Sequence, residues 1–121
     1  MKSGLLLLLL PALTLQAQQV TWLTPTTIDL GSVKKGATAT TTFRFTNPGA
    51  EPLIIDVIRT TCGCTAAQWP QEPILPGKAA DIRIEFHADN LGYFRRQIKV
   101  YFHGQRLAEK LYIEGLVEKG P

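Results

Sequence analysis

Apolar and polar residues alternate with a period of two along most of the chain, which is the pattern of strands that bury one face. The alternation is clearest in residues 37–46, where Phe43 and Phe45 share a face with Ala39 and Thr41. The opposite face of this segment is polar, and its many threonines are β-branched, as strands favour. These ten residues therefore predict a strand with one side in a hydrophobic core.

Other segments of the chain predict strands by the same alternation or by short apolar runs: residues 21–23, 27–30, 53–60, 66–69, 80–87, 94–102 and 105–117. The first two read as one strand broken at Pro25, which suits the edge of a sheet. Residues 53–60 carry apolar side chains on both faces, which favours a central or doubly covered strand. In the last segment, Leu107, Leu111 and Ile113 are expected to face inward.

Turn residues separate these segments. Asn47-Pro48-Gly49-Ala50 and Pro76-Gly77 combine a proline that presets φ with a glycine that accepts positive φ. His103-Gly104 reads as a tight hairpin turn. No segment has sustained helical periodicity. About seven short strands with turns every 8 to 12 residues are typical of a two-sheet sandwich. The fold class expected is all-β, an immunoglobulin-like antiparallel β-sandwich.

Residues 1–17 have the layout of a secretory signal peptide: Lys2, an apolar run from Leu5 to Leu10, and a small residue, Ala17, at the expected cut. The run is too short to span a bilayer, which takes about 20 apolar residues. Cleavage would leave residues 18–121 as one domain, with no membrane insertion and no N-terminal cysteine for a lipid anchor. The expected location is the periplasm or the extracellular space.

Composition narrows the range of functions. Thirteen basic and ten acidic residues give a net charge of +3 at pH 7. The basic residues are scattered, whereas nucleic-acid binders usually have a clustered basic stripe, so nucleic acid is not an expected partner. No local signature of a catalytic triad or a phosphate loop occurs. His87 and His103 read as surface residues, and the chain is not expected to be an enzyme.

The chain has two cysteines, which lie one glycine apart in Thr61-Cys62-Gly63-Cys64-Thr65. In an oxidising compartment such thiols form disulfides, bind metal or react. An internal disulfide needs a bent backbone, because Cα atoms two residues apart lie near 7 Å in an extended chain. Gly63 is expected to supply that freedom. Such a small ring would be easily reduced, as redox-active disulfides are.

Two other interpretations of Cys62 and Cys64 stay open. Two thiolates suit Cu(I) or half of a zinc site, although further ligands have no obvious spacing in the sequence. Alternatively, both are small buried side chains with a structural role, because buried cysteine behaves as a small hydrophobic residue. No other cofactor is expected. Trp69 is expected to pack beside the loop as an aromatic plug in the core.

Two surface features are further candidates for binding. Trp22 and Tyr93 are candidates for an exposed aromatic patch, although core or edge packing is the competing interpretation. The threonine-rich face of residues 38–42 is a candidate edge for accepting a partner strand, or an ordinary solvated face.

The order of short motifs along the chain resembles a known bacterial family. The motifs are Ile28-Asp29-Leu30-Gly31-Ser32-Val33, Gly36, Phe43-Arg44-Phe45-Thr46-Asn47-Pro48-Gly49, Pro52-Leu53-Ile54-Ile55, Thr61-Cys62-Gly63-Cys64-Thr65, Pro76-Gly77, Gly92 and Ile113-Glu114-Gly115. Together they resemble the domain of unknown function 1573, over roughly residues 26–117. The family often has Phe where this chain has Leu30. Cys-Gly-Cys-Thr is the specific element of the resemblance.

The resemblance implies a fold but no established activity. The family is common in exported proteins of Bacteroidetes-type bacteria and is related to the immunoglobulin-like domains of ciliary, centrosomal and major sperm proteins. By analogy, the expected function is a non-enzymatic binding or adaptor module that contacts another envelope or secreted protein. The alternative is a thiol-redox or Cu(I)- or Zn-binding protein that acts through Cys62 and Cys64, with Gly63, Thr65 and Trp69 as supporting residues.

Overall fold

The structure, a computed structural model, describes Gly4 and residues 20–120. The predicted signal peptide and its cleavage site therefore lie outside the described residues, apart from Gly4. The described strands are β1 (Thr21–Trp22), β2 (Thr27–Lys34), β3 (Thr38–Thr46), β4 (Ile55–Thr60), β5 (Thr65–Gln68), β6 (Ala79–His87), β7 (Gly92–Phe102) and β8 (Glu109–Glu118). The all-β prediction is confirmed, with eight strands where about seven were expected.

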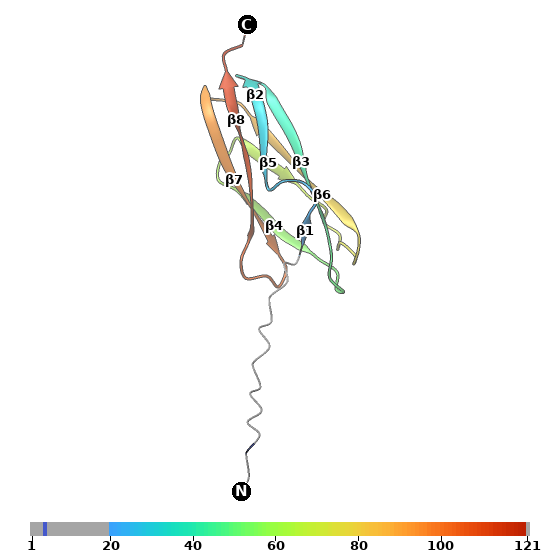
Figure 1. Ribbon diagram of the computed structural model, residues 1–121. Coiled ribbons are helices and arrows are strands. Elements are labelled where there is room, and N and C mark those ends of the chain that lie inside the picture. The colour runs from blue at the N-terminus through green and yellow to red at the C-terminus, as the bar shows by residue number, and fades with distance from the viewer. Residues whose placement is uncertain (1–3, 5–19, 121) are drawn as a thin grey trace.

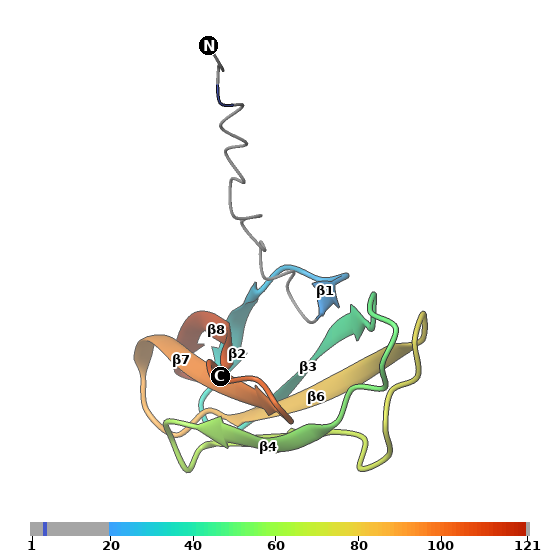
Figure 2. The same ribbon diagram turned by 90° about the horizontal axis from the view of Figure 1, so that it is seen from below.

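The strands form two packed sheets with the orders β1-β3-β6-β5 and β2-β8-β7-β4. Figure 2 looks along the sandwich and shows β2, β7 and β8 grouped on one side and β1, β3 and β6 on the other. Alternate residues of both sheets point into the space between them, which is where the predicted alternation places the apolar side chains. The described residues include no helix that is long and apolar enough to cross a membrane.

The predicted broken first strand is two strands, and they belong to different sheets. β1 pairs with β3, whereas β2 pairs with β8. Between them, the amide of Leu23 still donates to the carbonyl of Arg44 at 2.8 Å, and then Pro25, which has no N–H, ends the pairing with β3. Both strands lie at the edge of their sheet, as the proline predicted.

The sandwich is not purely antiparallel, because β2 runs parallel to β8. In Figure 1 both arrows point toward the C-terminal end of the chain. The register shifts between Asp29 and Ser32, where Gly31 has a φ of +70° and donates its N–H to the Asp29 carboxylate at 2.8 Å. A side chain at Gly115 would meet the Gly31 carbonyl and the Phe94 ring at 2.7 and 2.8 Å, so this bulge fits against a glycine.

Aromatic side chains join the two sheets in the core. Phe45 is fully buried, and its ring centroid lies 5.4 Å from that of Trp22 and 5.6 Å from that of Phe102. Toward the other end of the sandwich, Phe86 and Phe94 stack at 4.0 Å. The predicted core face of residues 37–46 is confirmed at Phe43 and Phe45.

Two strand predictions differ from the structure. Residues 53–60 do not form a central strand: β4 begins at Ile55 and lies at a sheet edge, while Leu53 makes an isolated bridge to Ile74. The last strand begins at Glu109, and Leu107 is 78% exposed rather than inward-facing. The connection from β7 to β8 is therefore six residues long rather than a two-residue hairpin. His103 and Gly104 do form a tight turn, in which the amide of Gln105 donates to the carbonyl of Phe102 at 3.0 Å and Gly104 has a φ of +81°.

Candidate functional site

Cys62 and Cys64 form a disulfide in the loop between β4 and β5. Their Cα atoms lie 5.2 Å apart, within the range that a disulfide spans. A tight turn shortens this distance, because the amide of Thr65 donates to the carbonyl of Cys62 at 3.1 Å. Of the three interpretations of the sequence, the internal disulfide is the arrangement that the structure has.

Two threonine side chains hold this loop in place. The hydroxyl of Thr60 contacts the carbonyls of Cys62 and Thr65 at 3.3 and 3.1 Å and so bridges the two ends of the loop. Thr65 is 5% exposed, and its hydroxyl lies 3.8 Å from Sγ of Cys64. A disulfide sulfur carries no hydrogen, so the Thr65 hydroxyl is the donor. The threonine that follows the cysteines in the motif thus contacts the disulfide itself.

Gly63 is not needed for the turn, contrary to the prediction. Neither Gly63 nor Cys64 has a positive φ, which fits a type I turn that most residues can adopt. A Cβ atom built at Gly63 meets no heavy atom within 4 Å. Glycine thus leaves the position between the two cysteines without a side chain.

Substitution of Gly63 by alanine is therefore expected to leave the protein as stable as the parent or more stable. At a compatible position, Gly→Ala stabilises by about 0.4–1 kcal/mol because it restricts the unfolded chain. Urea unfolding of the oxidised protein measures this change. The matched control is Gly77→Ala, because Gly77 has a φ of +77° and alanine should destabilise the protein there. A loss of stability in Gly63→Ala would show that the turn does require glycine.

The two sulfur atoms differ in their hydrogen bonds. Sγ of Cys62 accepts a hydrogen bond from the backbone amide of Cys64 at 3.2 Å. Sγ of Cys64 has the longer contact of 3.8 Å with the Thr65 hydroxyl. Both cysteines are half-buried, so the disulfide is neither enclosed in the core nor free in solvent.

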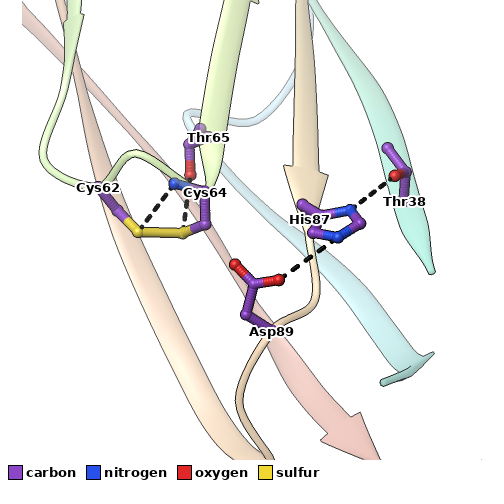
Figure 3. A network of polar contacts seen from close by, with 6 residues as sticks. All are labelled: Thr38, Cys62, Cys64, Thr65, His87 and Asp89. Atoms are coloured by element: carbon purple, nitrogen blue, oxygen red, sulfur yellow. Dashed lines mark hydrogen bonds and ion pairs between the residues drawn. A yellow bond between two sulfur atoms is a disulfide. The ribbon is translucent and has the colours of Figure 1, made fainter. Parts of the chain in front are cut away.

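The loop between β6 and β7 faces the disulfide, and the two loops enclose a hollow of about 340 Å³. The amide of His87 donates to the carbonyl of Cys64 at 2.8 Å, which places the end of β6 beside the loop. The His87 ring lies 3.0 Å from the Thr38 hydroxyl and 3.3 Å from the Asp89 carboxylate. Figure 3 shows Asp89 and His87 on the Cys64 side of the disulfide.

The rim of this hollow combines apolar and charged side chains. Leu91 and Tyr93 are 56% and 88% exposed, and both line the hollow together with Arg96. The guanidinium of Arg96 donates to the carbonyl of Arg95 at 3.3 Å. The sequence singled out Tyr93 but neither Leu91 nor Asn90.

The other sequence candidates lie away from this hollow. Trp69 is half-buried and packs against the core rather than filling it, and its indole N–H has no hydrogen-bond partner among the described residues. Trp22 packs on Phe45 in the sheet opposite Tyr93, so these two aromatic residues do not form one patch. His103 is exposed and lies 3.3 Å from the Asp56 carboxylate.

The threonines of residues 38–42 lie on β3, which pairs with β6 along its whole length. On its other side, β3 pairs with β1 only at Phe45 and Thr46. Among the described residues, this side of β3 is therefore paired with a strand only near its C-terminal end, so the interpretation as an edge for a partner strand stays open.

No cluster of three or more His, Cys, Asp or Glu side chains within the described part of the chain is arranged to hold a metal ion. A second, shallower depression of about 600 Å³ lies over the β2 bulge and is lined by Asp29, Ser32 and Gly115 among others. Two of its charged groups are paired with each other, since Arg95 lies 3.6 Å from Glu114, and the Asp29 carboxylate accepts from the amide of Gly31. The hollow beside the disulfide is therefore the stronger candidate.

Fold and site together define an all-β sandwich domain with an accessible disulfide at one loop end. The chain belongs to the family described as protein of unknown function DUF1573, whose family model matches residues 21–117. This confirms the resemblance seen in the sequence. No curated protein matches the chain at a significant level.

Solved structures of similar fold are distant in sequence. PapD-like domain 7 of human CEP192, an ASH domain, has a TM-score of 0.74 at 10% identity, with 99% of each chain covered. A Porphyromonas gingivalis W83 protein of unknown function has a TM-score of 0.70 at 19% identity, with 81% of this chain covered. The VesB protease of Vibrio cholerae has a TM-score of 0.68 at 13% identity, with 82% of this chain covered.

These likenesses show the fold alone. The match spans 46% of the P. gingivalis protein and 32% of the protease, whereas it spans nearly all of the PapD-like domain. The chain is therefore similar to a whole PapD-like sandwich and to parts of the two larger proteins. The expected relation to centrosomal sandwich domains is confirmed at the level of fold.

Proposed function

We propose that this protein is a non-enzymatic binding or adaptor module of the bacterial cell envelope. Its location is periplasmic or extracellular, and its partner is another envelope or secreted protein. The similarity to a complete PapD-like domain supports this class, although fold by itself does not determine function. Neither a nucleic acid nor a cofactor takes part in the proposed function.

The observation that carries the proposal is the rim of the hollow beside the disulfide. Leu91 and Tyr93 are both exposed there, next to a loop held by a disulfide and by the Thr60 hydroxyl. Exposed tyrosine beside a concave surface is characteristic of binding sites, because its ring supplies contact area with few rotatable bonds. The binding surface is therefore the loop end rather than a sheet edge.

Photo-crosslinking tests this assignment in the bacterium that makes the protein. A photoreactive phenylalanine analogue is placed at Leu91 or Tyr93, with matched controls at Leu107, which is exposed in the β7–β8 loop, and at Thr40 on β3. We expect one discrete crosslinked envelope protein from positions 91 and 93 and none from 107. Crosslinks from position 40 alone would move the interface to the sheet edge, and no crosslinks at any position would contradict the adaptor function.

Thiol chemistry at Cys62 and Cys64 is the second candidate function. The half-buried disulfide at the base of the hollow favours it. Metal binding has less support, since both thiols are joined to each other and a third ligand is not in place among the described residues.

A further inference from the structure

The Cys62–Cys64 disulfide is held in a way that suits exchange with an incoming thiol. Such exchange needs access to one sulfur along the S–S axis and a leaving sulfur whose negative charge is stabilised. Access is provided by the hollow, which Cys62, Gly63 and Cys64 line on one side. The disulfides that stay inert in folded proteins are those that no thiolate can reach.

The hydrogen bonds identify the leaving sulfur. The backbone amide of Cys64 already donates to Sγ of Cys62 at 3.2 Å, and a hydrogen bond to a charged acceptor is stronger than one to a neutral acceptor. This bond therefore strengthens as negative charge develops on Cys62. The Thr65 hydroxyl contact to Sγ of Cys64 is longer, at 3.8 Å, so Cys64 is the poorer leaving group and the better point of attack.

We propose that this disulfide captures a cysteine-bearing partner protein covalently and reversibly. The partner's thiolate attacks Sγ of Cys64, a partner–Cys64 disulfide forms, the Cys62–Cys64 bond breaks, and its electron pair leaves on Cys62 as a thiolate. The existing disulfide is the oxidant, so the step needs no other reagent. This inference rests on the proposed adaptor function and names the chemistry by which the same loop end holds its partner.

Release follows from the geometry of the loop. The Thr60 hydroxyl and the Thr65 amide hold the loop from its backbone, so opening the disulfide does not free Cys62 to move away. A thiolate held next to a mixed disulfide reacts with a high effective concentration. Cys62 therefore attacks Cys64 again and expels the partner's thiolate unless noncovalent contacts retain the partner.

The side chains around the hollow favour a protein thiol over a small thiol as the molecule that attacks the disulfide. Leu91 and Tyr93 offer apolar contacts on the rim, which a small polar thiol cannot use. Four charged or titratable side chains line the hollow: His87, Asp89, Tyr93 and Arg96. Arg96 attracts the incoming thiolate, and the carboxylate of Asp89 lies 3.3 Å from the His87 ring.

The chemical step is tested on the purified, oxidised, full-length chain with reduced glutathione as the probe. The native protein is mixed with millimolar glutathione, quenched with N-ethylmaleimide and mapped by mass spectrometry. We expect glutathione on Cys64 and maleimide on Cys62. For Gly63→Val, we expect glutathione to open the disulfide severalfold more slowly, while the melting temperature of the protein stays unchanged. The proposal is overturned if the disulfide opens only in denaturant, or if glutathione is found mainly on Cys62.

The partner is tested in the producing bacterium, where N-ethylmaleimide blocks the Cys62 thiolate and so traps the adduct before Cys62 can expel the partner. The native chain is expected to carry one protein on Cys64 through a disulfide that a reductant opens. Cys62→Ser is the matched control: it has no internal disulfide and therefore no oxidant for the exchange, so it is expected to form no adduct by this route. Adducts with glutathione alone, or an equal adduct from Cys62→Ser, would contradict capture of a protein by exchange. Crosslinking at position 93 in the variant with both cysteines replaced by serine reports the noncovalent adaptor function separately. Failure of covalent capture can therefore be distinguished from failure of the adaptor function.

Discussion

Replacing Phe45 with alanine is expected to lower the free energy of unfolding by about 3–5 kcal/mol, as large-to-small substitutions of buried phenylalanine do. Phe45 is fully buried between Trp22 of its own sheet and Phe102 of the opposite sheet, so its removal leaves a cavity at the contact between sheets. Domains of this size are stable by about 5–15 kcal/mol. The variant is therefore expected to be at or near the limit of folding.

Urea unfolding monitored by tryptophan fluorescence measures this loss, with the disulfide kept oxidised in both proteins. Leu107→Ala is the control, because this side chain is 78% exposed and its loss should change stability by no more than about 0.5 kcal/mol. A loss below about 1 kcal/mol for Phe45→Ala would mean that the surrounding rings collapse into the space, which the contacts to both neighbouring rings argue against.

Asn47→Ala is expected to destabilise the protein by about 3 kcal/mol, because unsatisfied buried polar groups cost about 1–3 kcal/mol each. The side chain of Asn47 is 1% exposed. Its amide group donates to the carbonyls of Glu51 and Ile74 at 2.7 and 2.9 Å, and its oxygen accepts from the amide of Gly49 at 2.9 Å. One side chain thus joins the β3–β4 connection to the segment before β6.

Chemical denaturation of Asn47→Ala and Asn47→Asp separates the donor from the acceptor function. Aspartate keeps an acceptor for Gly49 but turns a charged oxygen toward the two carbonyls, so it is expected to be at least as harmful as alanine at neutral pH. The exposed Asn90 provides the control, and Asn90→Ala should be neutral. Equal stability of Asn47→Ala and the parent would show that water replaces these bonds.

Most of the fold could be predicted because half-buried strands have a clear alternation of apolar and polar residues in the sequence. The alternation around Phe43 and Phe45 determines which face of β3 enters the core, and no long-range information is needed for that. The break at Pro25 was also visible. The sequence pattern could not show that β1 and β2 join different sheets, because a local pattern does not encode which strand becomes a neighbour.

Errors arose where a local pattern was outweighed by tertiary structure. Leu107 continues the apolar alternation, yet it lies in a six-residue loop and is exposed. Asn47 read as a turn residue, and its burial depends on carbonyls of Glu51 and Ile74 that come together only in the fold. The parallel pairing of β2 with β8 likewise joins segments about 85 residues apart in the sequence, as the register Thr27 to Tyr112 shows.

The candidate site could be located but not described from the sequence. Cys62 and Cys64 stood out by spacing and by the predicted export signal. The roles of the neighbours needed the structure: Thr65 touches a sulfur, Gly63 lines the hollow, and His87 from β6 lies beside Cys64. Residues of two loops form the hollow, and no sequence spacing links them.

The position of β8 between β2 and β7 determines when the second sheet can form during synthesis. β8 is the last of the described strands to leave the ribosome, and β2, one of the first, pairs with no other described strand in its sheet. Native contacts between distant segments make folding slow. A growing chain can therefore pair β3 with β6 early, but the edge of the second sheet that β2 occupies stays open until β8 has been made.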